Sequence, residues 1–209
     1  MPIGVPKVPY RLPGEIHPQW VDIYNYLSRE RILFLTQDLD DETTNQLIGL
    51  LLYLGSENKN RDVFLYVNSS GGPVIYGLSI VDTIQYIKVA VNTINVGTAT
   101  SIASFVVARG QREKRLALPH ARFIIHQPDG GSNGQATEIF SETEEVIRLR
   151  RAIGRLYSGF TGQPLSQIAK DLNRDAFLNA KQACKYGLID LVRKNTKFLI
   201  TVSSVDLIF

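Results

Sequence analysis

The chain has 209 residues, of which 44% are hydrophobic and 21% are charged, and its formal net charge at pH 7 is +3. These values are ordinary for a globular protein, and the charge is too small to indicate a nucleic acid as the partner. The length is enough for one sizeable core, and no apolar run approaches the roughly 20 residues that a membrane-spanning helix needs. The single cysteine leaves no disulfide within the chain, and the three histidines lack metal-site spacing.

The first fifteen residues indicate an extended, loop-like arm. Prolines stand at positions 2, 6, 9 and 13, and proline fixes φ and removes a backbone donor. No continuous apolar core follows the early charges, so no secretory signal is expected, and the arm is not rich in serine and arginine as a transit peptide is. The sequence leaves open whether the arm is only a floppy terminus or has a binding role.

Helical and strand patterns alternate after the arm. Apolar residues at helical spacing predict helices over residues 20–30, 40–57, 74–88 and 100–110. Short apolar runs predict strands over residues 31–37, 62–68, 90–96 and 121–128. This alternation favours βαβ crossovers and a largely parallel sheet covered by helices, which is an α/β fold. We expect one domain without internal repeats or linkers.

A long helix is expected over about residues 138–159. Its apolar residues step by three and four and form a narrow heptad-like seam, which consists of Val146, Leu149, Ile153, Leu156 and Phe160. Glutamates precede arginines along it, as the helix dipole favours, and Glu144 stands four residues before Arg148, the preferred order for an ion pair. The seam could pack on the chain's own core or on the same helix of a partner copy.

A shorter helix is expected after residue 179. Asn179 could cap it, with Gln182 completing a capping box, and Gly187 is a helix stop. Asp175 lies between an uncertain loop and this helix.

Ser101 lies in "GTATSIAS", just past a strand and at the start of an apolar helix. Helix N–H groups at such a point lack intrahelical partners and favour negative charge, so they could bind an oxyanion. The flanking residues are small and would let a substrate backbone approach. By itself, however, such a serine is more often a helix N-cap, and the motif is not the G-x-S-x-G of α/β-hydrolases.

Three further features could contribute chemistry. The glycines of "NSSGG" (68–72) expose backbone amides that could bind an anion or a peptide, although a tight turn is the commoner reading. His126 ends an apolar strand and could be a general base or a structural histidine, with His120 and His17 as alternatives. Asp175 could be a surface aspartate, or it could orient a histidine. The order Ser, His, Asp makes a triad plausible, but triads are recognised by geometry.

Together these segments resemble the proteolytic subunits of the Clp protease family, and the proline-rich start is similar to that of the plastid-encoded plant members. The blocks that carry the resemblance occur in order from about Val21 to Val192; they are NSSGG, GTATSIAS, RFIIHQP, GQAT, TGQPL, NRDAFLNA and YGLID. The resemblance implies a crotonase-like α/β fold of repeated ββα units. It also implies an N-terminal axial arm over residues 1–20, a protease domain over 21–192 with a protruding handle at about 127–160, and a divergent tail over 193–209.

The family is one of ATP-dependent serine endopeptidases that cleave unfolded proteins to short peptides through an acyl-enzyme. Carried over residue by residue, Ser101 matches the nucleophile, His126 the general base and Asp175 the residue that orients the imidazole. The backbone amides of Gly72 and Ile102 match the oxyanion hole.

The resemblance also implies partners. Seven subunits form a ring, two rings stack through their handles, and the segment 130–134 is a flexible strand beside the active site. Residues 71–77 match a strand-like edge that binds substrate backbone. The arm meets a hexameric AAA+ unfoldase that hydrolyses the ATP, so no cofactor or metal is expected in this subunit. Related subunits, some without the triad, share the ring, and the implied location is the chloroplast stroma.

The chain departs from the family pattern near the nucleophile. The family usually has proline at the position of Ser70, alanine at Thr100 and often methionine at Ile102. The bulk of Thr100 and Ile102 predicts reduced turnover, although the amide of Ile102 is retained. Two alternatives stay open: a non-catalytic, structural member of a mixed ring, and a crotonase-type acyl-CoA enzyme, since that fold shares oxyanion holes built from paired amides.

Overall fold

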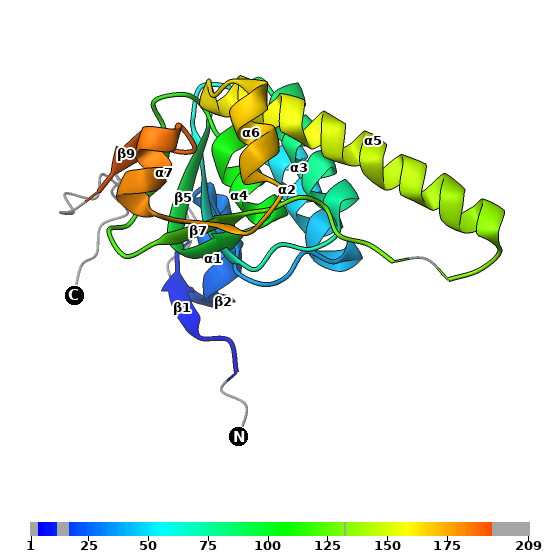
Figure 1. The fold of residues 1–209 in the computed structure, drawn as a ribbon. Helices are drawn as coiled ribbons and strands as arrows, with labels where there is room; N and C mark the ends of the chain where they lie inside the picture. Colours follow the sequence, from blue (N-terminus) through cyan, green and yellow to red (C-terminus); the bar gives the residue numbers. More distant parts are fainter. Residues whose placement is uncertain (1–3, 12–16, 132, 194–209) are drawn as a thin grey trace.

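The computed structural model describes residues 4–11, 17–131 and 133–193, and helices cover a seven-stranded sheet (Figure 1). The helices are α1 (Ile23–Arg29), α2 (Asp41–Glu57), α3 (Val74–Tyr86), α4 (Ile102–Arg109), α5 (Ala136–Thr161), α6 (Leu165–Asp171) and α7 (Ala180–Tyr186). The strands are β1 (Lys7–Tyr10), β2 (Gln19–Asp22), β3 (Ile32–Leu35), β4 (Val63–Ser69), β5 (Val91–Thr100), β6 (Arg115–Ala117), β7 (Arg122–Ile125), β8 (Ala176–Asn179) and β9 (Leu191–Val192).

The main sheet is parallel except at one edge. Its order is β3-β4-β5-β6-β9, and β7 pairs with the end of β5 and with β8. Every pair in it is parallel except β7–β8, which is antiparallel. Parallel neighbours need crossover connections, and α2, α3 and α4 provide them between successive strands. The prediction of a largely parallel, helix-covered sheet is therefore confirmed.

Helix α4 lies in the centre of the core. All its residues from Ile102 to Ala108 are buried, and the ring of Phe105 contacts the rings of Tyr157 and Phe160 at 5.1 Å between centroids. A helix that is apolar on every side is stable only when it is covered on every side. The beginning of α4 is consequently held in a fixed place relative to the sheet.

The predicted start of the first helix is wrong. Trp20 belongs to β2, which pairs antiparallel with β1, and α1 begins only at Ile23. Asp22 sets this start because its carboxylate accepts the N–H groups of Tyr24 at 2.8 Å and Asn25 at 3.4 Å. The arm thus contains a paired strand in place of a pure loop. Residues 1–3 and 12–16 of the predicted arm lie outside the described residues.

Several boundaries and short elements also differ from the predictions. Strand β5 continues to Thr100, so α4 starts two residues later than expected, whereas α2 ends at Glu57 as expected. Helix α6 and strands β6, β8 and β9 were not predicted, because each is too short to show a periodic pattern. The capped helix is confirmed as α7: Asn179 and Gln182 exchange two hydrogen bonds of 2.9 Å, and Gly187 follows at φ 93°.

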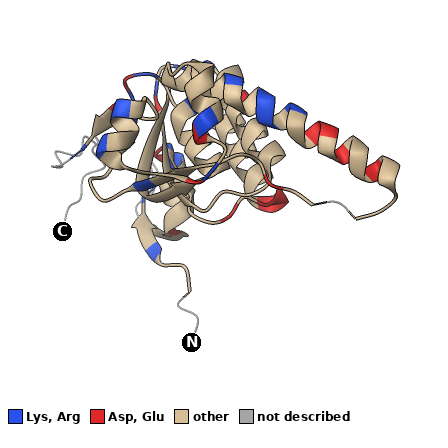
Figure 2. Cartoon of the chain, viewed as in Figure 1, with Lys and Arg blue, Asp and Glu red and all other residues tan. Residues whose placement is uncertain are grey.

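Helix α5 projects beyond the body of the molecule (Figure 1). The seam residue Ile153 is buried and the other four are half-buried, and this part of α5 packs against α4 and α6 of its own chain. Acidic residues line the projecting half and basic residues lie nearer the body (Figure 2). The predicted pair of Arg148 with Glu144 is wrong, since Arg148 contacts Glu145 at 2.9 Å instead. Among the described residues, no helix combines the length and apolarity needed to cross a bilayer.

Candidate active site

Ser101 links β5 to α4 in a strained backbone conformation. Its φ is 54° and its ψ is −127°, a region that is unfavourable for a residue with a Cβ atom and costs about 1–3 kcal/mol. The N–H of Ser101 donates to the carbonyl of Ile124 at 2.8 Å, which ties it to β7. The side chain makes no capping hydrogen bond to α4, so the interpretation of Ser101 as an ordinary N-cap is wrong.

His126 lies at the same edge of the sheet as Ser101. Thr100 pairs with Ile124 in the parallel β5–β7 ladder, so Ser101 and His126 both lie just past the carboxyl ends of neighbouring strands. The alternatives do not share this place: His120 precedes β7 at its other end, and His17 precedes β2 in the separate hairpin. The structure therefore brings only one of the three histidines to the edge where Ser101 lies.

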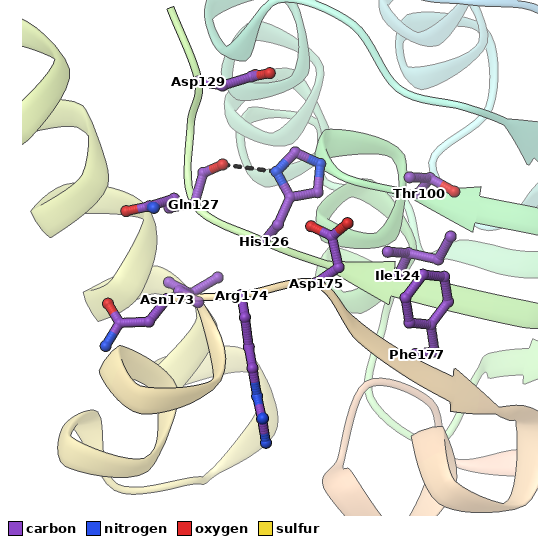
Figure 3. Close-up of a pocket in the computed structure, with 10 residues that line it drawn as sticks. Thr100, Ile124, His126, Gln127, Asp129, Asn173, Arg174, Asp175 and Phe177 are labelled. Carbon is purple, nitrogen blue, oxygen red and sulfur yellow. Dashed lines mark hydrogen bonds between the residues drawn. The ribbon is translucent and has the colours of Figure 1, made fainter.

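Asp175 reaches this edge through the unpredicted strand β8. The antiparallel β7–β8 ladder ends at the pair Ile125–Ala176, and the next pair in the same register is His126–Asp175. Side chains directly opposite one another in such a ladder have Cβ atoms about 4.5–5.5 Å apart. Figure 3 shows both side chains on the same side of the ladder, within one pocket. The sequence left the structure around Asp175 open, and the strand that follows Asp175 sets its position.

The imidazole of His126 makes its hydrogen bond to the main chain. Its Nδ1 lies 2.6 Å from the carbonyl oxygen of Gln127 (Figure 3). Because a carbonyl oxygen only accepts, Nδ1 carries a proton, and Nε2 of the neutral ring is left as the basic nitrogen. Within the described residues no hydrogen bond joins His126 to Ser101 or Asp175. The three residues therefore lie at one edge of the sheet, but no hydrogen bonds connect their side chains.

His126 and Asp175 line a pocket of about 370 Å³, and Thr100, the residue before Ser101, also lines it. Thr100, Ile124 and Phe177 line it from three adjacent strands, because they are register partners and share one face of the sheet. Its full lining is Thr100, Ile124, His126, Gln127, Asp129, Leu172, Asn173, Arg174, Asp175 and Phe177. The volume and the mixture of apolar and polar walls suit one or two side chains of a bound peptide.

The glycine turn after β4 packs directly against the serine. Gly71 has a φ of 99°, and a Cβ atom there would lie 2.7 Å from the carbonyl oxygen of Thr100 and 3.0 Å from the Cβ of Ser101. Gly72 has a φ of 153°, and in the described part of the chain its N–H has no hydrogen-bond partner. The first N–H of α4, from Ile102, also lacks an intrahelical acceptor. Two separate turns thus leave amides unpaired near Ser101, as an oxyanion hole requires.

The expectation of a strand-like edge over residues 71–77 is only partly met. Val74 to Gly77 form the first turn of α3, so their N–H and C=O groups do not form an extended edge. Nearby, residues 130–131 and 133–134 form neither helix nor strand, and Ser132 lies outside the described residues.

The residues that depart from the family pattern have distinct surroundings. Thr100 lines the pocket, whereas Ile102 is buried and packs so closely on Gly77 that a Cβ there would lie 1.9 Å from its Cγ1. The hydroxyl of Ser70 donates to the carboxylate of Asp38. Of the two bulky residues, only Thr100 therefore takes space from the pocket, whereas Ile102 fills the core. The described residues contain no cluster of three or more His, Cys, Asp and Glu side chains that could hold a metal ion.

Comparison with known proteins gives consistent matches over nearly the whole chain. The family model described as "Clp protease" matches residues 14–196. A protein named "ATP-dependent Clp protease proteolytic subunit" from Oltmannsiellopsis viridis is 60% identical over 192 residues, which is 92% of this chain and 98% of that protein. A protein of the same name from Chlorella vulgaris is 58% identical over 198 residues, which is 95% of this chain and 98% of that protein. Another, from Marchantia polymorpha, is 51% identical over 193 residues, which is 92% of this chain and 95% of that protein.

Proposed function

The chain belongs to the Clp protease family as a proteolytic subunit, a serine-type endopeptidase, and from this premise we propose that Ser101, His126 and Asp175 are its catalytic triad. The observation that carries the proposal is the pairing register, which sets His126 opposite Asp175 and beside the end of β5, where Ser101 follows Thr100. The unpaired amides of Gly72 and Ile102 complete the set as the oxyanion hole.

The proposed reaction is acyl transfer. Nε2 of His126 removes the proton of the Ser101 hydroxyl as the oxygen attacks a peptide carbonyl carbon, and the two amides stabilise the oxyanion. The imidazolium then protonates the leaving amine, and water hydrolyses the acyl-enzyme by the same route. Asp175 stabilises the imidazolium when Nδ1–H turns from the Gln127 carbonyl toward it, since Asp175 lies opposite His126 in the register. Tightening of catalytic hydrogen bonds on substrate binding is common.

The substrates are unfolded proteins, cut to short peptides, and the subunit works within stacked heptameric rings of related subunits. The projecting half of α5 is the handle between rings, and its exposed Ile139, Phe140 and Ile147 supply apolar surface for that contact. Residues 1–20 are the axial arm that meets an AAA+ unfoldase, which consumes the ATP, and 21–192 form the protease domain. The divergent tail over 193–209 lies, apart from its first residue, outside the described residues. The relatives come from plastid-bearing algae and plants, which supports the chloroplast stroma as the location.

Ser101→Ala in the assembled, full-length chain tests the proposal. We expect hydrolysis of a fluorogenic peptide to fall by at least about 10³-fold with assembly intact, and a fluorophosphonate probe to label only the unsubstituted chain. Ser79→Ala is the matched control, because the Ser79 hydroxyl donates only to the Tyr76 carbonyl within α3. Full activity of Ser101→Ala would contradict the triad, and an unlabelled, inactive parent chain would favour the structural ring member.

A further inference from the structure

The carbonyl oxygen of Ser101 accepts more hydrogen bonds than the start of a helix requires. The N–H of Ser104 donates to it at 3.1 Å, the hydroxyl of Ser104 at 2.7 Å, and the hydroxyl of Tyr157 approaches at 3.4 Å. Both side chains are buried: Ser104 has no exposed area, and Tyr157 is 2% exposed. Buried hydroxyls that converge on one backbone atom indicate that the position of that atom matters.

The two hydroxyls form a directed chain. The Tyr157 hydroxyl lies 2.8 Å from the Ser104 Oγ. Because Ser104 has one hydroxyl proton and gives it to the Ser101 carbonyl, its oxygen accepts from Tyr157. Successive bonds of this kind strengthen one another in a buried site. Burial also raises the pKa of Tyr157, so its hydroxyl remains a donor.

The chain of hydrogen bonds acts on the peptide group that carries an oxyanion donor. The carbonyl of Ser101 and the N–H of Ile102 belong to one peptide, which is trans, so they point in opposite directions. Holding the carbonyl toward Ser104 and Tyr157 therefore aims the N–H away from the core. We propose that Ser104 and Tyr157 are positioning residues that orient the Ser101–Ile102 peptide, an inference that rests on the proposed oxyanion role of the Ile102 amide.

The strained backbone of Ser101 explains why the hydrogen bonds of Ser104 and Tyr157 are needed. With φ at 54°, the residue would relax to another conformation unless its neighbours held it. The N–H side is held by Ile124 on β7, and the carbonyl side by the hydroxyl of Ser104 on α4, which accepts in turn from Tyr157 on α5. The Tyr157 ring is fixed separately by its edge contact with Phe105. Removal of the hydroxyl alone therefore leaves the packing in place.

Tyr157→Phe in the assembled, full-length chain tests the inference. We expect kcat on a fluorogenic peptide to fall about 3- to 10-fold with KM unchanged, as for the loss of one buried hydrogen bond that acts in the transition state. The affinity for a peptide aldehyde, which forms a tetrahedral adduct with the serine, should fall by the same factor. The affinity for a product peptide should not change. Ser104→Ala should likewise lower kcat and aldehyde affinity and leave KM and product affinity unchanged. The double variant should lower kcat and aldehyde affinity little further.

Tyr186→Phe is the matched control, since its hydroxyl donates to the carboxylate of Asp171 at 2.8 Å, and it should leave kcat and aldehyde affinity unchanged. Unchanged values in both Tyr157→Phe and Ser104→Ala would overturn the inference, as would an equal loss in Tyr186→Phe. Ser101→Ala is measured alongside them. An active Ser101→Ala would overturn the proposed function, whereas an inactive Ser101→Ala beside fully active Tyr157→Phe and Ser104→Ala would overturn this inference alone.

Discussion

His126 and Asp175 occupy opposite positions one step beyond the last pair of the β7–β8 ladder, Ile125–Ala176. The relationship exists because β8 is the one strand of the described main sheet that runs antiparallel to its neighbour. It begins where β7 ends, so the residue before β8 meets the residue after β7. A parallel strand at this edge would carry its first residue to the far end of the sheet.

This register predicts that Asp175 supports the imidazole and that Asp129, the other carboxylate of the pocket, does not. Asp175→Asn should lower kcat/KM for a peptide by about 10²- to 10⁴-fold, since the imidazolium loses its stabilising charge. Asp129→Asn should change it by less than about 3-fold, because Asp129 is exposed and lies outside the ladder. Steady-state kinetics on both variants would show the reverse order if Asp129 were the orienting group.

The strain at Ser101 predicts a gain in stability when its Cβ atom is removed. Ser101→Gly should be more stable than Ser101→Ala by about 1 kcal/mol, because glycine accepts a φ of 54° freely, and both variants should be inactive. The order should reverse at Ser79 inside α3, where glycine costs about 1 kcal/mol relative to alanine. Urea unfolding of the four variants measures both differences, and the same order at both sites would mean that Ser101 is unstrained.

The contact between the glycine turn and the serine predicts that Gly71→Ala impairs activity. The new Cβ would lie 2.7 Å from the Thr100 carbonyl at a φ of 99°, so the turn and its neighbouring amide at Gly72 must shift. We expect kcat/KM to fall by about 10-fold or more, in the range seen when an oxyanion donor is displaced. Gly49→Ala in α2 is the control, because no atom lies within 4 Å of its new Cβ. An active Gly71→Ala would show that the turn does not contribute to the site.

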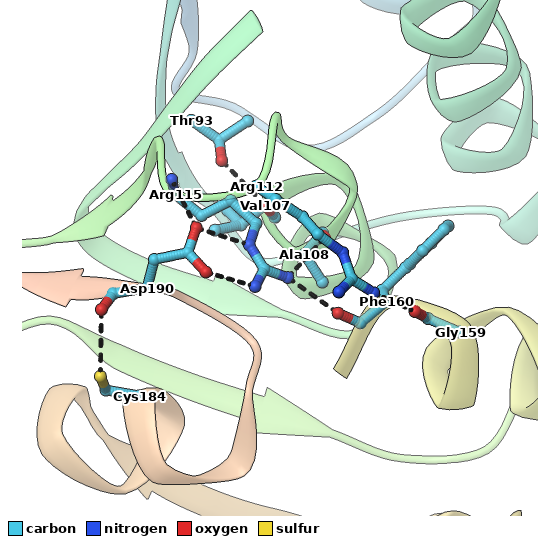
Figure 4. Close-up of polar contacts among 9 residues, drawn as sticks. All are labelled: Thr93, Val107, Ala108, Arg112, Arg115, Gly159, Phe160, Cys184 and Asp190. Atoms are coloured by element: carbon cyan, nitrogen blue, oxygen red, sulfur yellow. Dashed lines mark hydrogen bonds and ion pairs between the residues drawn. The ribbon is translucent and has the colours of Figure 1, made fainter. Parts of the chain in front are cut away.

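The ion pair of Arg115 with Asp190 predicts part of the pH dependence of stability. Arg115 is 5% exposed, and Asp190 accepts from it at 2.5 and 2.9 Å (Figure 4). Burial alone would raise the pKa of Asp190, but the hydrogen bonds from Arg115 outweigh it and the pKa is lowered. A lowered pKa means that this contribution is complete above the unfolded carboxyl pKa of about 3.9 and is lost as the pH falls through the folded value.

Asp190→Asn should therefore reduce the free energy of unfolding at pH 7 by about 2–4 kcal/mol, since it leaves a buried guanidinium without its countercharge. It should also flatten the decline in stability below about pH 4. Glu145→Gln removes the exposed partner of Arg148 and should change stability by less than about 0.5 kcal/mol. Equal effects of the two substitutions, measured by urea unfolding at pH 7 and pH 3, would contradict the structural role of the Asp190 pair.

Much of the fold could be predicted because its signals are local. Asp40 caps α2 by accepting the N–H of Thr43 at 2.7 Å, and Asn179 with Gln182 caps α7 in the same way. Each of these bonds joins residues three apart, so the residue types alone indicate them. Strand β8 gave no such signal, because its four residues alternate between half-buried and exposed, and its place depends on pairing with a distant segment.

The sequence by itself determined the alternation of the longer strands and helices, the caps of α2 and α7, and the residue types that could form an acyl-transfer site. Only the tertiary structure decided that His126, and not His17 or His120, lies at the edge beside Ser101, and that Asp175 stands opposite it. The physical reason is that the register between strands is set by hydrogen bonds and packing between segments far apart in the chain. The backbone of Ser101 depends on the same kind of contact, because the groups that hold it come from β7 and α5 as well as from α4.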